Sequence, residues 1–378
     1  MRIPFNKPYL TGRETEYMLD AVRLGKLSGN GAYTQACQAF LTERYGFGAT
    51  LLTTSGTDAL EMAALLLRIG PGDEVIVPSY TFVSTANAFV LRGATIVFAD
   101  SSPEHPNVDP AHVRTLLTER TRAIVLVHYA GVACDLDAFA DLARGTGVAL
   151  VEDAAQAIDA TYRGRPLGTF GALAAFSFHE TKNVISGEGG ALAVNAAEHA
   201  ERAEVIWEKG TNRSAFFRGE VDKYGWVDVG SSFLPSEATA AFLYAQLEHI
   251  DAIQARRSAL YRRYATALAS VAAESGAFTL PYVPDYAGHN AHTFYLVCRD
   301  GTTRDGLLAH LKTHGILAVS HYISLHSSAF ARQRSPEPPP HLPQADRYTE
   351  RLLRLPLFHE LREADVDEIC GRVADYVR

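Results

Sequence analysis

The chain has 378 residues, of which 47% are hydrophobic, and a formal net charge of −8 at pH 7. This balance disfavours an electrostatic nucleic-acid binder, and no apolar run approaches the roughly 20 residues of a membrane span. The four cysteines lie far apart without a CxxC pair, which argues against a thiolate metal site and a disulfide framework. We therefore expect a cytoplasmic protein without a metal, long enough for two domains.

A phosphate site is predicted near the start of the chain, after helices expected over 11–24 and 33–45. Residues 53–57 (Thr-Thr-Ser-Gly-Thr) lie between a short apolar strand and a strongly apolar helix. Free N–H groups and the helix dipole attract an anion at such an N-terminus. An ordinary cap needs only Ser55 or Thr57, so five such residues favour a phosphate. Neither GxxxxGK[ST] nor GxGxxG is present, which excludes the Walker and dinucleotide fingerprints.

Apolar strands and helices then alternate. We predict strands over 74–77, 95–99, 123–127 and 148–151, with one helix ending at Leu91 and another over 136–143. This order indicates a mostly parallel sheet that is buried on both faces. Ligands bind such sheets at the carboxyl ends of the strands. Phe82, His128 and Asp153 lie at or just beyond such ends.

Two charged residues have apolar surroundings in the sequence. Burying the carboxylate of Asp153 costs free energy unless a cation lies beside it. The alternative is a helix cap, which is the more common role of a lone aspartate at the end of a strand. Lys182 follows the small and aromatic run 171–178 and precedes a loop whose glycines, 187, 189 and 190, allow close approach to a ligand. A lysine partly withdrawn from water loses its proton more readily and becomes a nucleophile. A solvated lysine before a turn is the alternative.

The second half of the chain begins with a long polar segment. Residues 209–226 interleave cations with aromatic rings, a composition that suits a diphosphate clamp with a stacked base, an oligomer interface, or both. A helix over 237–246 follows.

A small α+β domain is predicted from about Ile250. Its expected elements are a long basic helix, strands over 293–297 and 317–322, a helix over 304–314, a proline-rich loop over 335–343 and a final helix with an apolar stripe at Val366, Ile369, Val373 and Tyr376. We divide the chain into a large domain with an N-terminal arm, 1–249, and a small domain, 250–378.

One cofactor requires a phosphate cup, an aromatic ring, a buried carboxylate and a reactive lysine at one sheet edge. Pyridoxal phosphate attaches to a lysine and needs an acidic partner that keeps its pyridine nitrogen protonated. Its phosphate suits a helix N-terminus with hydroxyl groups. Motifs of competing chemistries, HExxH and GxSxG, are absent.

The chain resembles the DegT/StrS family of pyridoxal-phosphate sugar aminotransferases over nearly its whole length. The motifs that carry the resemblance are Thr54-Ser-Gly-Thr57, Pro78-Ser-Tyr-Thr-Phe82, Glu152-Asp-Ala-Ala-Gln156, Phe176-Ser-Phe-His-Glu-Thr-Lys182 and Gly187-Glu-Gly-Gly190. The resemblance implies the α/β fold of aspartate aminotransferase, fold type I, with a mostly parallel central sheet and a small C-terminal α+β domain.

The resemblance also implies roles for single residues. Lys182 would hold the cofactor and move the reacting proton, and Asp153 would pair with the pyridine nitrogen. The other cofactor contacts would come from Gly56, Thr57 and Ser177 at the phosphate, Phe82 and Ala155 on the ring faces, and Gln156 at the ring hydroxyl.

Active sites of this family lie at a dimer interface, so residues 209–232 would reach the neighbour's cofactor. The Asn-Tyr-Arg that many members carry is replaced by Ser-Phe-Leu at 232–234, so Asn212 or Ser232 is expected to supply the cross-subunit phosphate contact. Expected substrate contacts are Lys209, Arg213, Arg218, Lys223 and Tyr224 of that segment, together with Tyr322 and His326.

The expected reaction moves the amino group of L-glutamate to the 4-keto carbon of dTDP-4-keto-6-deoxyglucose. Segments 79–93, 128–134 and 209–213 resemble the branch with this activity. Lys182, where a related dehydratase branch has histidine, favours transamination. The alternatives are amination at C3 of a dTDP-3-keto-6-deoxyhexose and a non-catalytic regulator that binds the cofactor. The set of Asp153, Gln156, Ser177 and Lys182 argues against the regulator.

Overall fold

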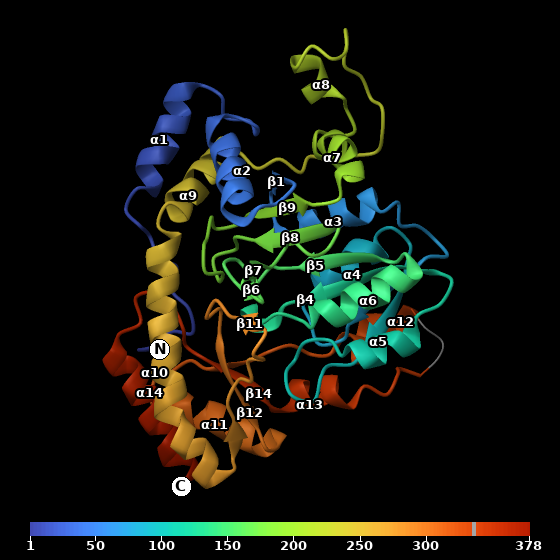
Figure 1. Cartoon of the computed structure of the whole chain (residues 1–378). Helices are drawn as coiled ribbons and strands as arrows, with labels where there is room; N and C mark the ends of the chain where they lie inside the picture. The colour runs from blue at the N-terminus through green and yellow to red at the C-terminus, as the bar shows by residue number, and fades with distance from the viewer. Residues whose placement is uncertain (335–337) are drawn as a thin grey trace.

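A seven-stranded sheet forms the centre of the computed structural model, which describes residues 1–334 and 338–378 (Figure 1). The strand order is β1-β9-β8-β5-β4-β2-β3. The bounds are Ala49–Thr53 (β1), Glu74–Pro78 (β2), Thr95–Ala99 (β3), Thr121–Val127 (β4), Ala149–Asp153 (β5), Leu173–Ser177 (β8) and Gly190–Val194 (β9). The mostly parallel sheet is confirmed. Only β9 runs antiparallel to its neighbours among these strands, because a loop rather than a crossover helix connects it to β8.

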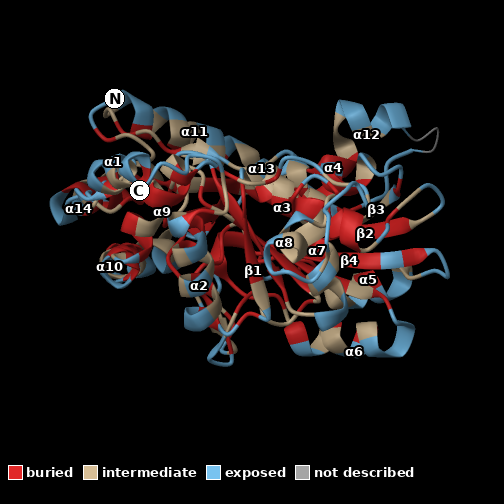
Figure 2. Ribbon diagram, turned by 90° about the horizontal axis from the view of Figure 1, so that it is seen from above, coloured by how far each residue is buried: buried red, intermediate tan, exposed pale blue. Residues whose placement is uncertain are grey.

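Helices cover both faces of this sheet. One face packs against α2 (Ala32–Tyr45), α5 (Pro110–Leu116), α6 (Leu136–Thr146) and α9 (Glu237–Leu247). The other packs against α3 (Gly56–Leu66), α4 (Val83–Val90) and α7 (Ala200–Trp207). Figure 2 shows buried strands between helices whose outer sides are exposed. Successive strand residues therefore point into different cores: Leu150 into the first and Val151 into the second.

A second, antiparallel sheet lies in the C-terminal part of the chain. Its order is β10-β12-β14-β13, with bounds Phe278–Thr279, Phe294–Cys298, Leu352–Leu355 and Val319–Ser320. It shares a core with α10 (Ile250–Ser275), α11 (Gly301–Thr313) and α14 (Glu363–Val377). Ile3 of the N-terminal arm belongs to this core. The α+β character is confirmed, and the boundary between residues 249 and 250 stays a prediction.

The remaining elements are short or peripheral. They are α1 (Glu14–Leu24), α8 (Arg213–Phe217), α12 (Ala329–Arg334), α13 (Pro343–Arg351), the 3-10 turns η1 (Tyr129–Gly131), η2 (Ala197–His199) and η3 (Leu325–Ser327), and a small sheet of β11 (Ala287–Gly288), β6 (Thr161–Tyr162) and β7 (Arg165–Pro166). Among the described residues, no helix has both the length and the apolar character that crossing a membrane requires.

Several predicted boundaries differ for physical reasons. The first helix begins at Glu14 rather than Thr11, because the buried Glu14 carboxylate accepts the N–H groups of Thr11 and Gly12 and holds them in a turn. The strand expected over 317–322 shrinks to β13, because the Leu317 N–H donates to Ile3 of the N-terminal arm instead.

Two segments that were predicted to be loops contain helical residues, in α8 and α13. The segment expected to be a loop over 209–226 contains α8. Of the proline-rich loop expected over 335–343, residues 335–337 lie outside the described structure, and Pro343 opens α13.

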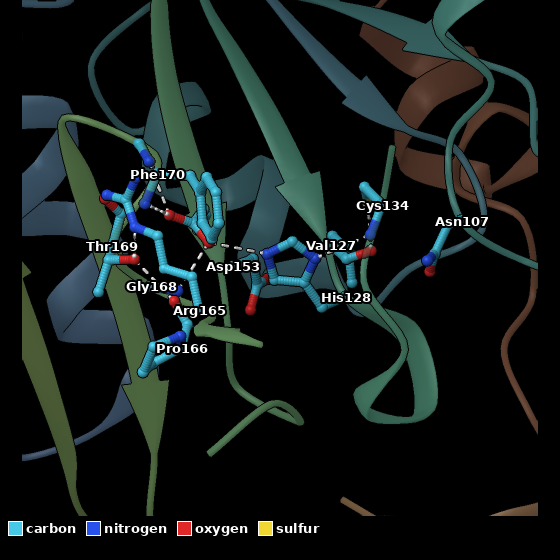
Figure 3. Close-up of polar contacts among 12 residues, drawn as sticks. Asn107, Val127, His128, Cys134, Asp153, Arg165, Pro166, Gly168, Thr169 and Phe170 are labelled. Atoms are coloured by element: carbon cyan, nitrogen blue, oxygen red, sulfur yellow. Dashed lines mark hydrogen bonds and ion pairs between the residues drawn. The ribbon is translucent and has the colours of Figure 1, made fainter. Parts of the chain in front are cut away.

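The carboxylate of Glu152, near the end of β5, is fully buried and accepts four hydrogen bonds (Figure 3 shows this part of the sheet). Oε2 accepts from Nε2 of His128 at 3.0 Å and from the N–H of Gly168 at 2.7 Å. Oε1 accepts from the N–H groups of Phe170 at 2.7 Å and Gly171 at 2.6 Å. Glu152 therefore joins the end of β4 to the turn that precedes β8.

These contacts determine which ring nitrogen of His128 carries the proton and in which direction the pKa of Glu152 shifts. Nδ1 of His128 accepts the Cys134 N–H, so the ring proton of His128 is on Nε2 and points to Glu152. Burial by itself would raise the pKa of Glu152, but the hydrogen bond from His128 and the backbone donors outweigh it and lower the pKa below the ordinary 4.5. His128 thus lies on the face of the sheet that carries Glu152, opposite to the side of Asp153.

Replacing Glu152 by glutamine should lower the free energy of unfolding by about 3 kcal/mol at pH 7, because the amide NH₂ would face two donors. A carboxyl whose pKa is lowered on folding stabilises above its unfolded pKa and loses that contribution as pH falls. The difference between wild type and Glu152→Gln should therefore shrink below about pH 4.5. Urea unfolding across pH measures this, with the exposed Glu43→Gln as control; a loss under about 1 kcal/mol would contradict the role.

Candidate active site

A cavity of about 710 Å³ opens at the carboxyl ends of β5 and β8, next to the N-terminus of α3. Of the predicted site residues, it brings together Gly56, Thr57, Phe82, Asp153, Ala155, Gln156, Ser177, Lys182 and Tyr322. Its other walls come from the C-terminal part, with His292, His321 and Arg354, and from Phe5 and Asn6 of the N-terminal arm. Segments far apart in the sequence therefore enclose one space.

One end of the cavity has the features of an anion-binding site. Ser55 caps α3, its Oγ accepting the Asp58 N–H, and the other N–H groups of that first turn have no partner within the helix. Hydroxyl groups surround this helix end, because the Thr57 Oγ1 lies 2.7 Å from the Ser84 Oγ and Ser177 lies beside Gly56. Helix dipole, N–H groups and hydroxyls together suit a phosphate.

Two glycines allow this arrangement by close packing. A Cβ at Gly56 would lie 2.9 Å from the Cβ of Ser177. A Cβ at Gly190 would overlap the backbone of Ser55 and Gly56. We expected the glycine-rich loop to approach a ligand, and Gly190 instead lets β9 approach the start of α3.

Asp153 is buried on the face of β5 opposite to Glu152 and has fewer donors. The Thr85 hydroxyl donates to Oδ2 at 2.7 Å, and the Ala155 N–H donates to Oδ1 at 3.2 Å. Thr81 Oγ1 lies 2.9 Å from Thr85 Oγ1 and donates to it, since the Thr85 proton is directed at Asp153. Burial raises the pKa of Asp153, and the donors and the charge of Lys182 offset this only in part. The carboxylate keeps acceptor capacity for a further cationic donor.

Lys182 lies in the loop between β8 and β9, half-buried in the cavity wall. Its backbone N–H donates to the His179 carbonyl at 2.8 Å, and the backbone N–H of Glu180 donates to the Gly187 carbonyl across the loop. These two hydrogen bonds fix the backbone of the loop. Burial lowers the pKa of Lys182 to about 8; Asp153 opposes this shift and the positive charge of Arg354 adds to it. The neutral, nucleophilic amine is therefore accessible near neutral pH.

The amide of Gln156 is oriented by its neighbours. Oε1 accepts the Ala130 N–H at 2.7 Å, which leaves Nε2 to donate to the Tyr322 hydroxyl at 3.2 Å. One Nε2 proton remains for a ligand. Phe82 lines the cavity with its ring centroid 6.2 Å from that of Tyr322.

His292, beside Lys182 in the cavity wall, was not predicted. Asn183 donates both amide protons, to Gln254 and to the Asn290 carbonyl, so its Oδ1 must accept from Nδ1 of His292 at 2.9 Å. This contact requires a proton on Nδ1 of His292. Burial, followed by the charge of Lys182, keeps the pKa of His292 well below its ordinary value.

The residues expected to contact substrate from 209–232 lie away from this cavity in the single chain (Figure 1, near α8). Lys209, Arg213, Lys223, Tyr224 and Ser232 are exposed, and Arg218 forms ion pairs at 2.8 Å with Glu204 and Glu220. Asn212 Oδ1 accepts the Gly225 N–H within the same segment. Their roles toward substrate or a second chain stay predictions.

His326 also lies outside the lining of the cavity. It is 4% exposed, with Nδ1 2.7 Å from the Ser79 hydroxyl and Nε2 3.5 Å from Asp346. In the described structure its side chain thus joins η3 to the end of β2. Its role as a substrate contact stays a prediction without support from this geometry.

Sequence reasoning missed Thr85, His292 and Arg354. Thr85 carries no motif, because a threonine in the first turn of a helix is ordinary. Arg354 had a detectable signal, since it is the one charged residue in the apolar strand Leu352–Leu355.

The observed groups fit pyridoxal phosphate. The α3 N-terminus suits its phosphate, the partly satisfied Asp153 its pyridinium, the free Nε2 proton of Gln156 its ring hydroxyl, and Lys182 its aldehyde.

Comparisons with known proteins agree with this fit. A model of the DegT/DnrJ/EryC1/StrS aminotransferase family matches residues 8–374. The chain is 33% identical to the spore coat polysaccharide biosynthesis protein SpsC of Bacillus subtilis over 383 residues, covering 100% of this chain and 97% of SpsC.

Two solved structures show the likeness in three dimensions. DesV of S. venezuelae has a TM-score of 0.90 and 32% identity, covering 100% of this chain and 99% of DesV. The PLP form of the putative sugar aminotransferase Spr1654 of Streptococcus pneumoniae has a TM-score of 0.90, with 100% and 99% covered, and at 23% identity it shows the shared fold. The chain therefore belongs to the DegT/DnrJ/EryC1/StrS aminotransferase family, and it is a sugar transaminase of fold type I with pyridoxal phosphate as its cofactor.

Proposed function

We propose that this transaminase transfers the amino group of L-glutamate to the 4-keto carbon of dTDP-4-keto-6-deoxyglucose, forming a dTDP-4-amino-4,6-dideoxyhexose in the cytoplasm. The observation that carries the chemistry is the meeting of Lys182, Asp153 and Gln156 in one cavity with a phosphate cradle. The choice of C4 rests on the resemblance of segments 79–93, 128–134 and 209–213 to dTDP-4-amino-4,6-dideoxygalactose transaminase. The name of SpsC, a polysaccharide biosynthesis protein, supports a sugar substrate.

Each residue has a defined task in this proposal. When bound, pyridoxal phosphate stores the amino group between the two half-reactions and withdraws electrons from the carbon that exchanges a proton. Nζ of Lys182 holds the cofactor and then moves that proton. A carboxylate oxygen of Asp153 keeps the pyridine nitrogen protonated, and Phe82 and Ala155 hold the two ring faces.

The proposal includes a homodimer with shared active sites. Residues 213–229 extend from the molecule with exposed apolar side chains, Phe217, Tyr224 and Trp226, the last 85% exposed (Figure 1). Lys209, Arg213 and Lys223 have no ion pair in the described part of the chain and remain available for a diphosphate. Ser232, which is exposed, is a better candidate for the cross-subunit phosphate contact than Asn212, whose Oδ1 accepts the Gly225 N–H.

Lys182→Ala should abolish covalent capture of pyridoxal phosphate by the apoprotein. Borohydride reduction followed by peptide mass spectrometry should find the label on Lys182 in wild type and in the exposed-lysine control Lys312→Ala. Because only the neutral amine reacts, the capture rate should rise about tenfold per pH unit below pH 8 and level off above it. A label of wild-type yield on another lysine of Lys182→Ala would contradict the assignment.

Asp153→Asn should lower turnover about 100-fold or more while the protein stays folded, because a neutral amide cannot hold the pyridine nitrogen protonated. Steady-state kinetics and thermal melting measure the two effects, and the exposed Asp141→Asn serves as control. Near wild-type turnover of Asp153→Asn would refute the role.

Incubation with L-glutamate and dTDP-4-keto-6-deoxyglucose should give a sugar with an amine at C4, read by proton NMR. The couplings of H4 to H3 and H5 distinguish the galacto from the gluco product. If glutamate aminates the cofactor but this sugar gains no amine, the 4-keto substrate is wrong, and the 3-keto isomer is tested next.

A further inference from the structure

The residue that follows Lys182 is a buried asparagine whose side chain makes three hydrogen bonds. The amide nitrogen of Asn183 donates to Oε1 of Gln254 and to the carbonyl of Asn290, each at 2.9 Å. Its Oδ1 accepts from Nδ1 of His292, also at 2.9 Å. The residue is 6% exposed, and both of its amide protons are used. All three partners belong to the C-terminal part of the chain, so this side chain ties the lysine loop to that part.

The partners are themselves held in one orientation. The Gln254 amide nitrogen donates to the Ile158 carbonyl at 3.2 Å, which leaves its oxygen as the acceptor. Asn290 donates to the carbonyls of Gln156 and Ile158 at 2.8 and 2.7 Å. Its Oδ1 accepts the backbone N–H of His292 at 3.0 Å. A buried network of paired amides specifies one arrangement, so it fixes the loop between β8 and β9 relative to the residues that follow β5.

His292 is the member of this network that reaches the cavity. Among the described residues, the lining includes its ring but none of the three amide side chains of Asn183, Gln254 and Asn290. Burial, and then the charge of Lys182, keep the pKa of His292 well below its ordinary value, so the ring is a weak base near pH 7. The ring is therefore better suited to hold Asn183 than to exchange protons with a substrate.

The amine of Lys182 has no such support of its own. In the part of the chain that the structure describes, no hydrogen bond or ion pair holds its Nζ. Its four-carbon stem is flexible, so the place of the amine depends on where the backbone of residues 182 and 183 directs the stem. This amine must hold the cofactor and then move the reacting proton, and a misplacement of about 1 Å can slow a reaction about 100-fold.

We propose that His292 is a positioning residue for Lys182: its Nδ1–H holds Asn183 and thereby fixes the loop from which the amine reaches the reacting atoms. This inference rests on the proposed function, in which Lys182 is the catalytic amine. Loss of the contact should lower the rates at which Lys182 reacts. It should leave the affinity for the amino-acid donor near that of wild type, because the other walls of the cavity are unchanged.

Two substitutions separate the two ring nitrogens of His292. The amide nitrogen of asparagine can take the place of Nδ1, and that of glutamine can take the place of Nε2. For His292→Gln, borohydride trapping should show that the apoprotein captures pyridoxal phosphate at Lys182 more slowly, on the order of 10- to 100-fold. His292→Asn keeps the donor to Asn183 and should stay within about fivefold of wild type.

The amino-acid half-reaction gives a second measurement on the cofactor-loaded full chain. Single-turnover absorbance with L-glutamate should show a lower maximal rate for His292→Gln, again on the order of 10- to 100-fold. The apparent dissociation constant of L-glutamate should stay within about threefold of wild type. Rates are compared below the onset of thermal melting of every variant, so a loss of stability alone does not lower them.

A double-mutant cycle tests whether His292 and Asn183 act through one contact. The double variant His292→Gln/Asn183→Ala should be no slower than the slower single variant, within about twofold. His341→Asn changes an exposed histidine outside the cavity lining and should behave as wild type. If His292→Gln does not fold, Asn183→Ser breaks the same contact from the other side and should show the same slow capture.

Wild-type rates in His292→Gln would overturn the proposal. Slow His292→Asn with retained rates in His292→Gln would also overturn it and would assign the other ring nitrogen to the reaction. If both variants are slow, the cycle decides, because additive losses refute a shared contact and non-additive losses support it. Failure of wild type to aminate the sugar would reject the proposed substrate, while capture at Lys182 and the L-glutamate half-reaction would still decide the role of His292.

Discussion

A buried carboxylate is stable only where donors meet it, and this constraint organises the end of β5. Glu152 and Asp153 are consecutive and point to opposite faces of the strand. Glu152 has four donors from its own chain, which outweigh burial and lower its pKa, whereas Asp153 has two, and burial raises its pKa. Glu152 thus completes the fold by tying β4, β5 and the turn before β8 together. Asp153 keeps acceptor capacity on the side where the cavity opens.

The same distinction applies to the cations. Lys182 has Asp153 as a nearby negative charge, and Arg354 has no counter-ion among the described residues. The cavity therefore places two basic side chains, Lys182 and Arg354, in one space. They meet only because three parts of the chain come together there: the loop after β8, the strand β14 and the N-terminal arm with Phe5. The arm and β14 belong with the C-terminal sheet, so movement of that sheet relative to the large one would change the shape of the cavity.

Much of the large sheet could be predicted, because a strand buried on both faces is a short continuous apolar run. The runs 74–77, 95–99, 123–127 and 148–151 correspond to β2, β3, β4 and β5. Since ligands bind at the carboxyl ends of such strands, Phe82 and Asp153 could be placed at the cavity in advance. The same rule misjudged His128, because strand residues alternate between faces and a shift of one residue turns a side chain away from the site. The short β13 and the late start of α1 were missed because their deciding partners, Ile3 and the Glu14 side chain, act through hydrogen bonds that no local pattern reveals.

The sequence by itself determined the fold class, the family and several residues that line the cavity, among them Asp153, Gln156 and Lys182. Those properties reside in contiguous motifs such as Glu152-Asp-Ala-Ala-Gln156 and in the period of apolar residues, which depend on neighbours along the chain. The tertiary structure alone decided which of two adjacent carboxylates is structural and which neighbours orient Gln156 and His292. It also decided that Arg354 lines the cavity of Lys182 with no counter-ion among the described residues. The reason is physical: protonation and charge balance depend on burial and on donors from distant segments, and only the folded chain brings these together.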